Sequence, residues 1–238
     1  MEQIYTIPVN EAFEWSRDDH SCGCPVCTIY NRLEENELDL ILGASMMEPD
    51  IRIKTNETGF CRTHYDMMFV RKNRLGMALT LESHLAELQK DLTEASIPFV
   101  QPKGDKPARR LAKLMDDCYV CGRIEHNFTL MQETAALLWE QDPEFRTKCA
   151  AQPFFCLHHF GTFVACAKAR MSRRDFGDFY KAVSVQMDTF MDTLNADVSW
   201  FVKKFDYRYE DEPWGNAKDA PERAIAFLGG VIHVDEEE

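Results

Sequence analysis

Cys24-Pro25-Val26-Cys27 is the stretch that decides the fold, because Cys61-Arg62-Thr63-His64 follows 34 residues after Cys27. A tetrahedral metal ion takes four ligands, and zinc accepts both thiolate sulfur and imidazole nitrogen. The C-x-x-C spacing lets two sulfurs reach one ion, and a distant C-x-x-H pair can complete the shell. The stretch therefore predicts a metal site of the Cys3His type.

The second half of the chain repeats this pattern. Cys118-Tyr119-Val120-Cys121 is followed, 35 residues after Cys121, by Cys156-Leu157-His158-His159. An offset of 94 aligns the two C-x-x-C pairs, and it also aligns Glu48-Pro49-Asp50-Ile51-Arg52 with Asp142-Pro143-Glu144-Phe145-Arg146. After one inserted residue, an offset of 95 aligns the two C-x-x-H pairs. Agreement at residues that have no reason to bind metal indicates an internal duplication.

The duplication assigns the ligands to two sites, and we expect each half to hold a site of its own. The predicted ligands are Cys24, Cys27, Cys61 and His64 in the first half, and Cys118, Cys121, Cys156 and His159 in the second. His158 adjoins His159, but the repeat register gives the ligand role to His159. The remaining cysteines have no cysteine partner in the register and are predicted to be spectators: Cys22, Cys149 and Cys166.

Composition supports a globular protein with a hydrophobic core. The chain has 238 residues, of which 45% are apolar and 11% aromatic. Its net charge of -13 and pI near 5.0 disfavour nucleic-acid binding, which requires a surface that neutralises phosphates. Residues 1–10 show no export signal and no apolar run is long enough to span a membrane, so we expect a cytoplasmic protein. Nine cysteines in that compartment are expected to be reduced or metal-bound.

Hydrophobic periodicity predicts an all-α fold of two helical repeats that pack as a pseudo-two-fold pair. Helices are expected to leave each C-x-x-C pair, and the acid-Pro-acid steps should begin new short helices. Two longer apolar stripes follow, at 75–92 and 176–205, and Ser172 with Asp175 forms a capping box before the second. We expect both stripes in one shared core or against a second copy of the chain, as in a homodimer, with His84 on the surface.

The repeat and the distribution of proline and glycine predict the domain boundaries. Residues 1–97 form a first repeat with an N-terminal lead-in, and residues 98–108 form a linker with two prolines and a glycine among its first seven residues. Residues 109–208 form the second repeat. Residues 209–238 form a C-terminal extension that ends in the acidic tail Asp235-Glu236-Glu237-Glu238.

The chemistry of the ligand set favours two structural zinc ions. Four protein ligands leave no open position for an activated water, so we expect a scaffold or regulatory binding protein, not an enzyme. The sequence contains no H-E-x-x-H motif and no phosphate-binding glycine loop. Iron-sulfur clusters also accept cysteine and histidine, and metal-free cysteines could form thiol redox pairs, so both alternatives remain open. We expect the scaffold to bind a protein or a small-molecule partner.

The combination of the motifs CPVC, GFCRTH, CYVC and FFCLHH with the later stretch EPWG resembles an uncharacterised family of bacterial cytoplasmic proteins of unknown function. The resemblance covers most of the chain. It implies a helical, metal-binding protein in which the eight repeated cysteines and histidines are ligands. It implies no reaction, substrate or catalytic residue.

Overall fold

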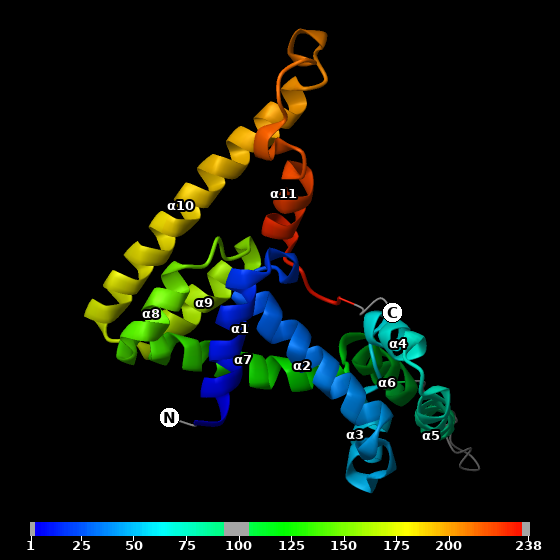
Figure 1. The fold of residues 1–238 in the computed structure, drawn as a ribbon. Helices are drawn as coiled ribbons and strands as arrows, with labels where there is room; N and C mark the ends of the chain where they lie inside the picture. The colour runs from blue at the N-terminus through cyan, green and yellow to red at the C-terminus, as the bar shows by residue number, and fades with distance from the viewer. Residues whose placement is uncertain (1–2, 93–104, 235–238) are drawn as a thin grey trace, which may run out of the picture. The chain divides into compact units, whose positions relative to one another are not determined.

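The computed structural model describes residues 3–92 and 105–234, and in them the chain forms eleven α-helices and no strand (Figure 1). The predicted all-α fold is therefore confirmed. Residues 98–104 of the predicted linker and the acidic tail lie outside the described residues. None of the described helices is long and apolar enough to cross a membrane.

The chain divides into two compact units, each of which draws segments from both sequence halves. Among the described residues, the first unit comprises 3–31 and 128–234, and the second comprises 32–92 and 105–127. The chain passes from one unit to the other within α2 and again within α7. The α-helices are α1 (Thr6–Asp18), α2 (Pro25–Leu42), α3 (Pro49–Thr58), α4 (Arg62–Val70), α5 (Arg74–Leu92), α6 (Asp105–Asp116), α7 (Tyr119–Gln141), α8 (Pro143–Ala150), α9 (Leu157–Arg170), α10 (Arg173–Lys203) and α11 (Ala220–Gly229).

The first unit is built around phenylalanine rings. Helix α1 packs on α8, while α10 packs on α8, α9 and α11, as the labelled ribbons of Figure 1 show. The ring of Phe13 lies 4.7 Å from that of Phe145 and 6.2 Å from that of Phe155. Phe163 and Phe179 continue the cluster, with ring centroids 5.1 Å apart. All five side chains are fully buried, so this unit has a dense aromatic core.

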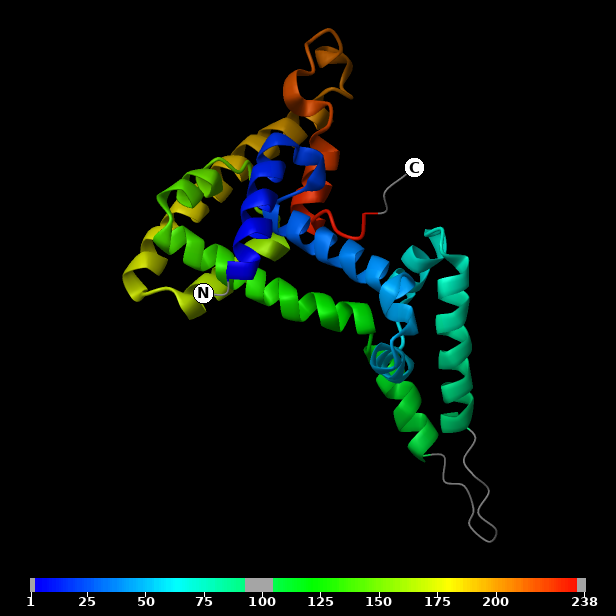
Figure 2. The ribbon, with the colours of Figure 1, turned by 60° about the horizontal axis from the view of Figure 1, so that its bottom comes forward.

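The second unit has a core of aliphatic and methionine side chains. Helix α5 packs on α3, α4 and α6, and α3 also contacts α6; Figure 2 shows α5 and α6 as neighbouring helices. The buried core side chains include Leu38, Ile41, Met67, Met68 and Met77. Methionine fills irregular gaps but is conformationally flexible, so this core is less rigidly specified than one of packed rings.

Several helices begin at the proline and capping residues that the sequence analysis identified. Pro49 and Pro143 each lie in the first turn of a short helix, and the Asp142 side chain accepts a hydrogen bond of 2.9 Å from the Glu144 N–H. Ser172 caps α10 by accepting a bond of 3.2 Å from the Asp175 N–H. The predicted long helix is confirmed, with 31 residues.

The two sequence halves contain the same order of helices, although superposition about a two-fold axis stays a prediction. Each half runs from a helix at C-x-x-C to a short proline-started helix, a helix at C-x-x-H and a long helix. The prediction of one shared core for the two long helices is wrong, because α5 and α10 belong to different compact units.

The buried face of α5 also differs from the prediction. Leu75 and Leu85, which both belong to the predicted apolar stripe, are 69% and 61% exposed. The helix instead buries Gly76, Met77, Thr80 and His84. His84 was expected on the surface, but its ring lies against Gly59 and its Nδ1 is 3.1 Å from the Asn56 carbonyl oxygen. Hydrogen bonding and close backbone approach, not leucine content, select this face.

Candidate metal centres

The eight predicted ligands lie in two groups of four, each with three cysteines and one histidine. Cluster 1 consists of Cys24, Cys27, Cys156 and His159, and cluster 2 consists of Cys61, His64, Cys118 and Cys121. Each cluster therefore combines the C-x-x-C pair of one half with the C-x-x-H pair of the other. The predicted pairing within each half is wrong. His158 is exposed and belongs to neither group.

The length of the helices explains why the pairs cross between halves. Helix α2 has 18 residues and carries the chain about 27 Å away from the first C-x-x-C pair. Helix α3, which lies between α2 and Cys61, has 10 residues and covers only about 15 Å. Similarly, α7 has 23 residues and α8 has 8, which correspond to about 35 Å and about 12 Å. The chain of each half does not return to the start of its first helix before the C-x-x-H pair.

Every ligand pair lies at the N-terminus of a helix. Cys24 and Cys118 immediately precede α2 and α7, while Cys61 and Cys156 are the N-caps of α4 and α9. The second ligand of each pair follows three residues later, in the first helical turn. Helix N-termini present unsatisfied N–H groups and a partial positive charge, which stabilise thiolates. Each cluster thus joins two helix N-termini.

Cluster 1 is compact and fully buried. The Sγ atoms of Cys24 and Cys27 lie 3.5 Å apart, and those of Cys27 and Cys156 lie 3.8 Å apart. The Nδ1 atom of His159 is 3.6 Å from the Cys24 sulfur and 3.3 Å from the Cys27 sulfur. All four side chains are buried.

Cluster 2 has similar distances between its ligand atoms, but it is more exposed than cluster 1. His64 Nδ1 lies 3.0 Å from the Cys61 sulfur, 3.2 Å from the Cys118 sulfur and 3.4 Å from the Cys121 sulfur. The Cys61 and Cys121 sulfurs are 4.0 Å apart. His64 is buried, Cys61 and Cys118 are half-buried, and Cys121 is exposed.

These separations fit the edges of a tetrahedral zinc site. With Zn–S bonds of about 2.3 Å, the ligand atoms of a regular tetrahedron lie about 3.8 Å apart, and somewhat closer where nitrogen replaces sulfur. The separations of 3.0 to 4.0 Å in the two clusters bracket this edge. Both clusters could therefore hold a metal ion.

One cysteine in each cluster lies in surroundings that favour a thiolate. Hydrogen bonds from the Cys24 and Cys27 thiols, with further bonds from the N–H groups of the C-x-x-H turn, lower the pKa of Cys156 to about 3. Hydrogen bonds from Cys121 and His64 likewise lower the pKa of Cys118 to about 3. Ligand thiols must be deprotonated to bind metal, so each cluster offers a metal ion one sulfur that already favours its charged form.

His64 of cluster 2 has a buried carboxylate partner. Its Nε2 atom lies 2.9 Å from Oε1 of Glu34, a residue on α2 with only 1% exposure. Burial disfavours the charged imidazole, but hydrogen bonds to Cys118 and Glu34 outweigh this effect and raise the His64 pKa to about 10. A metal on Nδ1 would leave the Nε2 proton to bond Glu34, and such carboxylate partners orient histidine ligands.

The histidine of cluster 1 has an aromatic neighbour instead. The ring of Phe128 lies 5.5 Å from that of His159. Phe128 is the repeat equivalent of Glu34 at the offset of 94. The ligand motifs alone gave Glu34 no role. The repeat register contained the signal, because Glu34 occupies a position that is apolar in the other half.

A segment near the C-terminus covers cluster 1. The Val231 N–H donates a 3.4 Å hydrogen bond to the Cys27 sulfur, and the Val231 carbonyl accepts one of 2.8 Å from Asn31. Gly230 has a φ of +76°, and a side chain there would lie 3.4 Å from the Cys156 sulfur. Gly23, at φ +80°, lets Val231 approach closely. We call residues 230–233 the strap.

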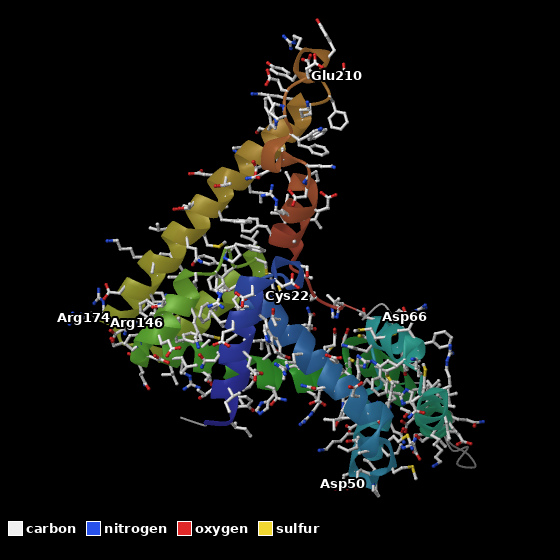
Figure 3. The ribbon with its side chains drawn as sticks, viewed as in Figure 1. Cys22, Asp50, Asp66, Arg146, Arg174 and Glu210 are labelled. Atoms are coloured by element: carbon white, nitrogen blue, oxygen red, sulfur yellow. The ribbon has the colours of Figure 1, made fainter. Side chains whose placement is uncertain are left out.

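The three remaining cysteines lie outside both clusters, as the sequence predicted. Cys22, labelled in Figure 3, lies in the short turn before α2, where its sulfur donates to the Asp19 carbonyl at 2.9 Å. Cys149 is buried, and burial raises its pKa to about 12. Cys166 is half-buried on α9, and burial also raises its pKa. None of the three is among the grouped ligand atoms of the described residues.

The fold and the two clusters define a class: all-helical proteins in which Cys3His groups join helix N-termini. Within that class, the chain belongs to a family of unknown function, DUF6062, whose family model matches residues 1–235. The predicted membership of an uncharacterised family is thus confirmed. Searches of curated proteins and of solved structures found no match to the chain.

Proposed function

We propose that the protein is a zinc-binding helical scaffold with two structural sites, in which clusters 1 and 2 each hold one zinc ion. The observation that carries this proposal is the convergence of four suitable ligand atoms from two helix N-termini in each cluster. Four protein ligands fill the coordination shell of zinc, as in structural sites, and leave no position for a reacting water.

The metal ions would fix contacts between segments that are distant in the sequence. Cys27 and Cys156 are 129 residues apart, and His64 and Cys121 are 57 apart. Closing such loops costs conformational entropy, and the free energy of metal binding offsets that cost. Zinc would therefore contribute to folding, and the assembled helices would form the surface that binds a protein or small-molecule partner.

We also propose that the protein is cytoplasmic. Six of its nine cysteines lie in the two candidate zinc sites. Thiolate ligands of this kind suit a reducing compartment, where cysteines bind metal more often than they form disulfides.

Elemental analysis with absorption spectroscopy tests the proposal. Protein purified without chelator is expected to contain two zinc ions per chain and to be colourless, because zinc has a filled d shell. Removing zinc with a strong chelator should lower the melting temperature markedly, since structural zinc is coupled to folding. Iron with a visible absorption band would instead establish the iron-sulfur alternative, and metal-free folded protein would overturn the proposal.

A further inference from the structure

Cys121 is the exposed ligand among the eight, and its surroundings suggest more than a structural role. We propose that cluster 2 is a modification site at which hydrogen peroxide or a small organic hydroperoxide oxidises Cys121 and releases the zinc ion. This inference rests on the proposed zinc binding. Cluster 1 does not share the reactivity.

The equivalent cysteine of cluster 1 provides an internal comparison. Cys27 occupies the repeat position of Cys121, three residues after the first cysteine of its pair and in the first turn of its helix. Cys27 is fully buried, and the strap covers it with the hydrogen bond from the Val231 N–H. An N–H bond to a thiolate also stabilises its charge and lowers its nucleophilicity. Cys121 is exposed as a residue and only half-buried as a ligand, so a small oxidant can reach its sulfur.

A second thiol lies close enough to complete the reaction. The Cys61 sulfur is 4.0 Å from that of Cys121. Cys118 lies three residues before Cys121, and the two side chains are hydrogen-bonded to each other. A disulfide requires the sulfurs to approach to about 2.05 Å. Cys61 is the N-cap of α4, outside its regular turns, so its side chain can move toward Cys121 once the metal no longer holds it.

The reaction needs only the peroxide, two thiolates of cluster 2 and protons from water. The Cys121 thiolate attacks one peroxide oxygen, the O–O bond breaks, and a sulfenic acid forms as an alkoxide or hydroxide leaves. The thiolate of Cys61 or Cys118 then attacks the sulfenic sulfur, forms the disulfide and expels hydroxide. Two thiolates lose two electrons in total, and the peroxide gains them. The leaving group of each step takes a proton from water, which gives one molecule of alcohol or water and one further molecule of water. Zinc loses two of its four ligands and dissociates.

The charge of the protein favours a neutral oxidant. The chain carries a net charge of -13, which repels anionic electrophiles over distances of about the Debye length. Hydroperoxides are uncharged near neutral pH and small enough to approach a half-buried cluster. Hydroperoxides are therefore the oxidants that suit this site.

The experiment uses the full-length, zinc-loaded protein carrying Cys22→Ser and Cys166→Ser, which removes the half-buried spectator thiols. Hydrogen peroxide is added, zinc release is followed with a chromophoric chelator, and the remaining thiols are alkylated before peptide mass spectrometry. We expect one zinc ion to leave at least tenfold faster than the other, together with a disulfide from Cys121 to Cys61 or Cys118. The Cys24, Cys27 and Cys156 peptides should stay reduced at that stage.

Cys121→His provides the matched variant, because it keeps four zinc ligands while removing the exposed sulfur. It should retain two zinc ions and lose the fast release. Equal release from both clusters, early oxidation at Cys27, or fast release that persists in Cys121→His would overturn the inference. Absence of zinc from the untreated protein would instead contradict the proposed function, so the two failures are distinguishable.

Discussion

Clusters 1 and 2 share their ligand set, ligand spacing and placement at helix N-termini, yet the protein encloses them differently. Cluster 1 lies beside an aromatic core, since Phe155 precedes its ligand Cys156, and the strap closes over it. Cluster 2 lies in the unit with the methionine-containing core and leaves Cys121 exposed. The repeated motifs therefore supply the same ligands in both clusters but not the same surroundings, because the strap lies outside both predicted repeats.

The side chains that contact the two ligand histidines also differ between the clusters. Glu34 and Phe128 occupy equivalent repeat positions, and each contacts the histidine of its own half. A carboxylate fixes His64 by hydrogen bonding, whereas an aromatic ring packs against His159. Cluster 2 therefore depends on charge and hydrogen bonding, and cluster 1 depends on burial.

The largest difference in zinc affinity between the two clusters is expected when the Glu34 carboxylate is neutralised. Glu34→Gln keeps the side-chain shape but removes the negative charge beside the His64 imidazole, and loss of such a partner weakens metal binding about 10- to 100-fold. Competition titration with a chromophoric chelator should show this loss at one site only, with cluster 1 unchanged. Glu35→Gln, on the same helix, is the control and should leave both affinities as they are. Unchanged zinc affinity in Glu34→Gln would show that the carboxylate does not support cluster 2.

A smaller effect is expected from loosening the strap. In Gly23→Ala the new Cβ would lie 2.9 Å from the Val231 Cβ, at a φ of +80° that costs an L-residue about 1–2 kcal/mol. Cluster 1 should then release zinc to a chelator several-fold faster, while cluster 2 keeps its rate. Gly161→Ala is the matched control, since nothing lies within 4 Å of its added Cβ. Identical release from cluster 1 in both variants would mean that the strap does not protect the metal.

The smallest effects are expected at the spectator cysteines. Cys22→Ser, Cys149→Ser and Cys166→Ser should each retain two zinc ions by elemental analysis, because none contributes to a cluster. Cys149→Ser should still reduce the free energy of unfolding by about 1–3 kcal/mol, because it places a hydroxyl in a buried site. Loss of a metal ion from any of these variants would place a ligand where the structure has none.

The sequence predicted the helices and the ligand candidates because both depend on local or repeated patterns. The capping residue Ser172 and the apolar spacing of α10 are readable over a few turns. The pairing of the ligands depends on whether the chain returns to the first C-x-x-C pair after α2. Neither the spacing between the ligand pairs nor the repeat contains that information. The buried face of α5 depended on contacts such as that of His84 with Gly59, which periodicity alone does not contain.

Each proposed zinc site takes ligands from both halves of the chain, and the zinc content of two double variants tests this pairing. Cys27→Ser with Cys156→Ser removes two ligands from cluster 1 alone, so this protein should retain one zinc ion. Cys27→Ser with Cys61→Ser removes one ligand from each cluster and should retain none. Pairing within each half would give the reverse result, with no zinc in the first variant and one zinc ion in the second.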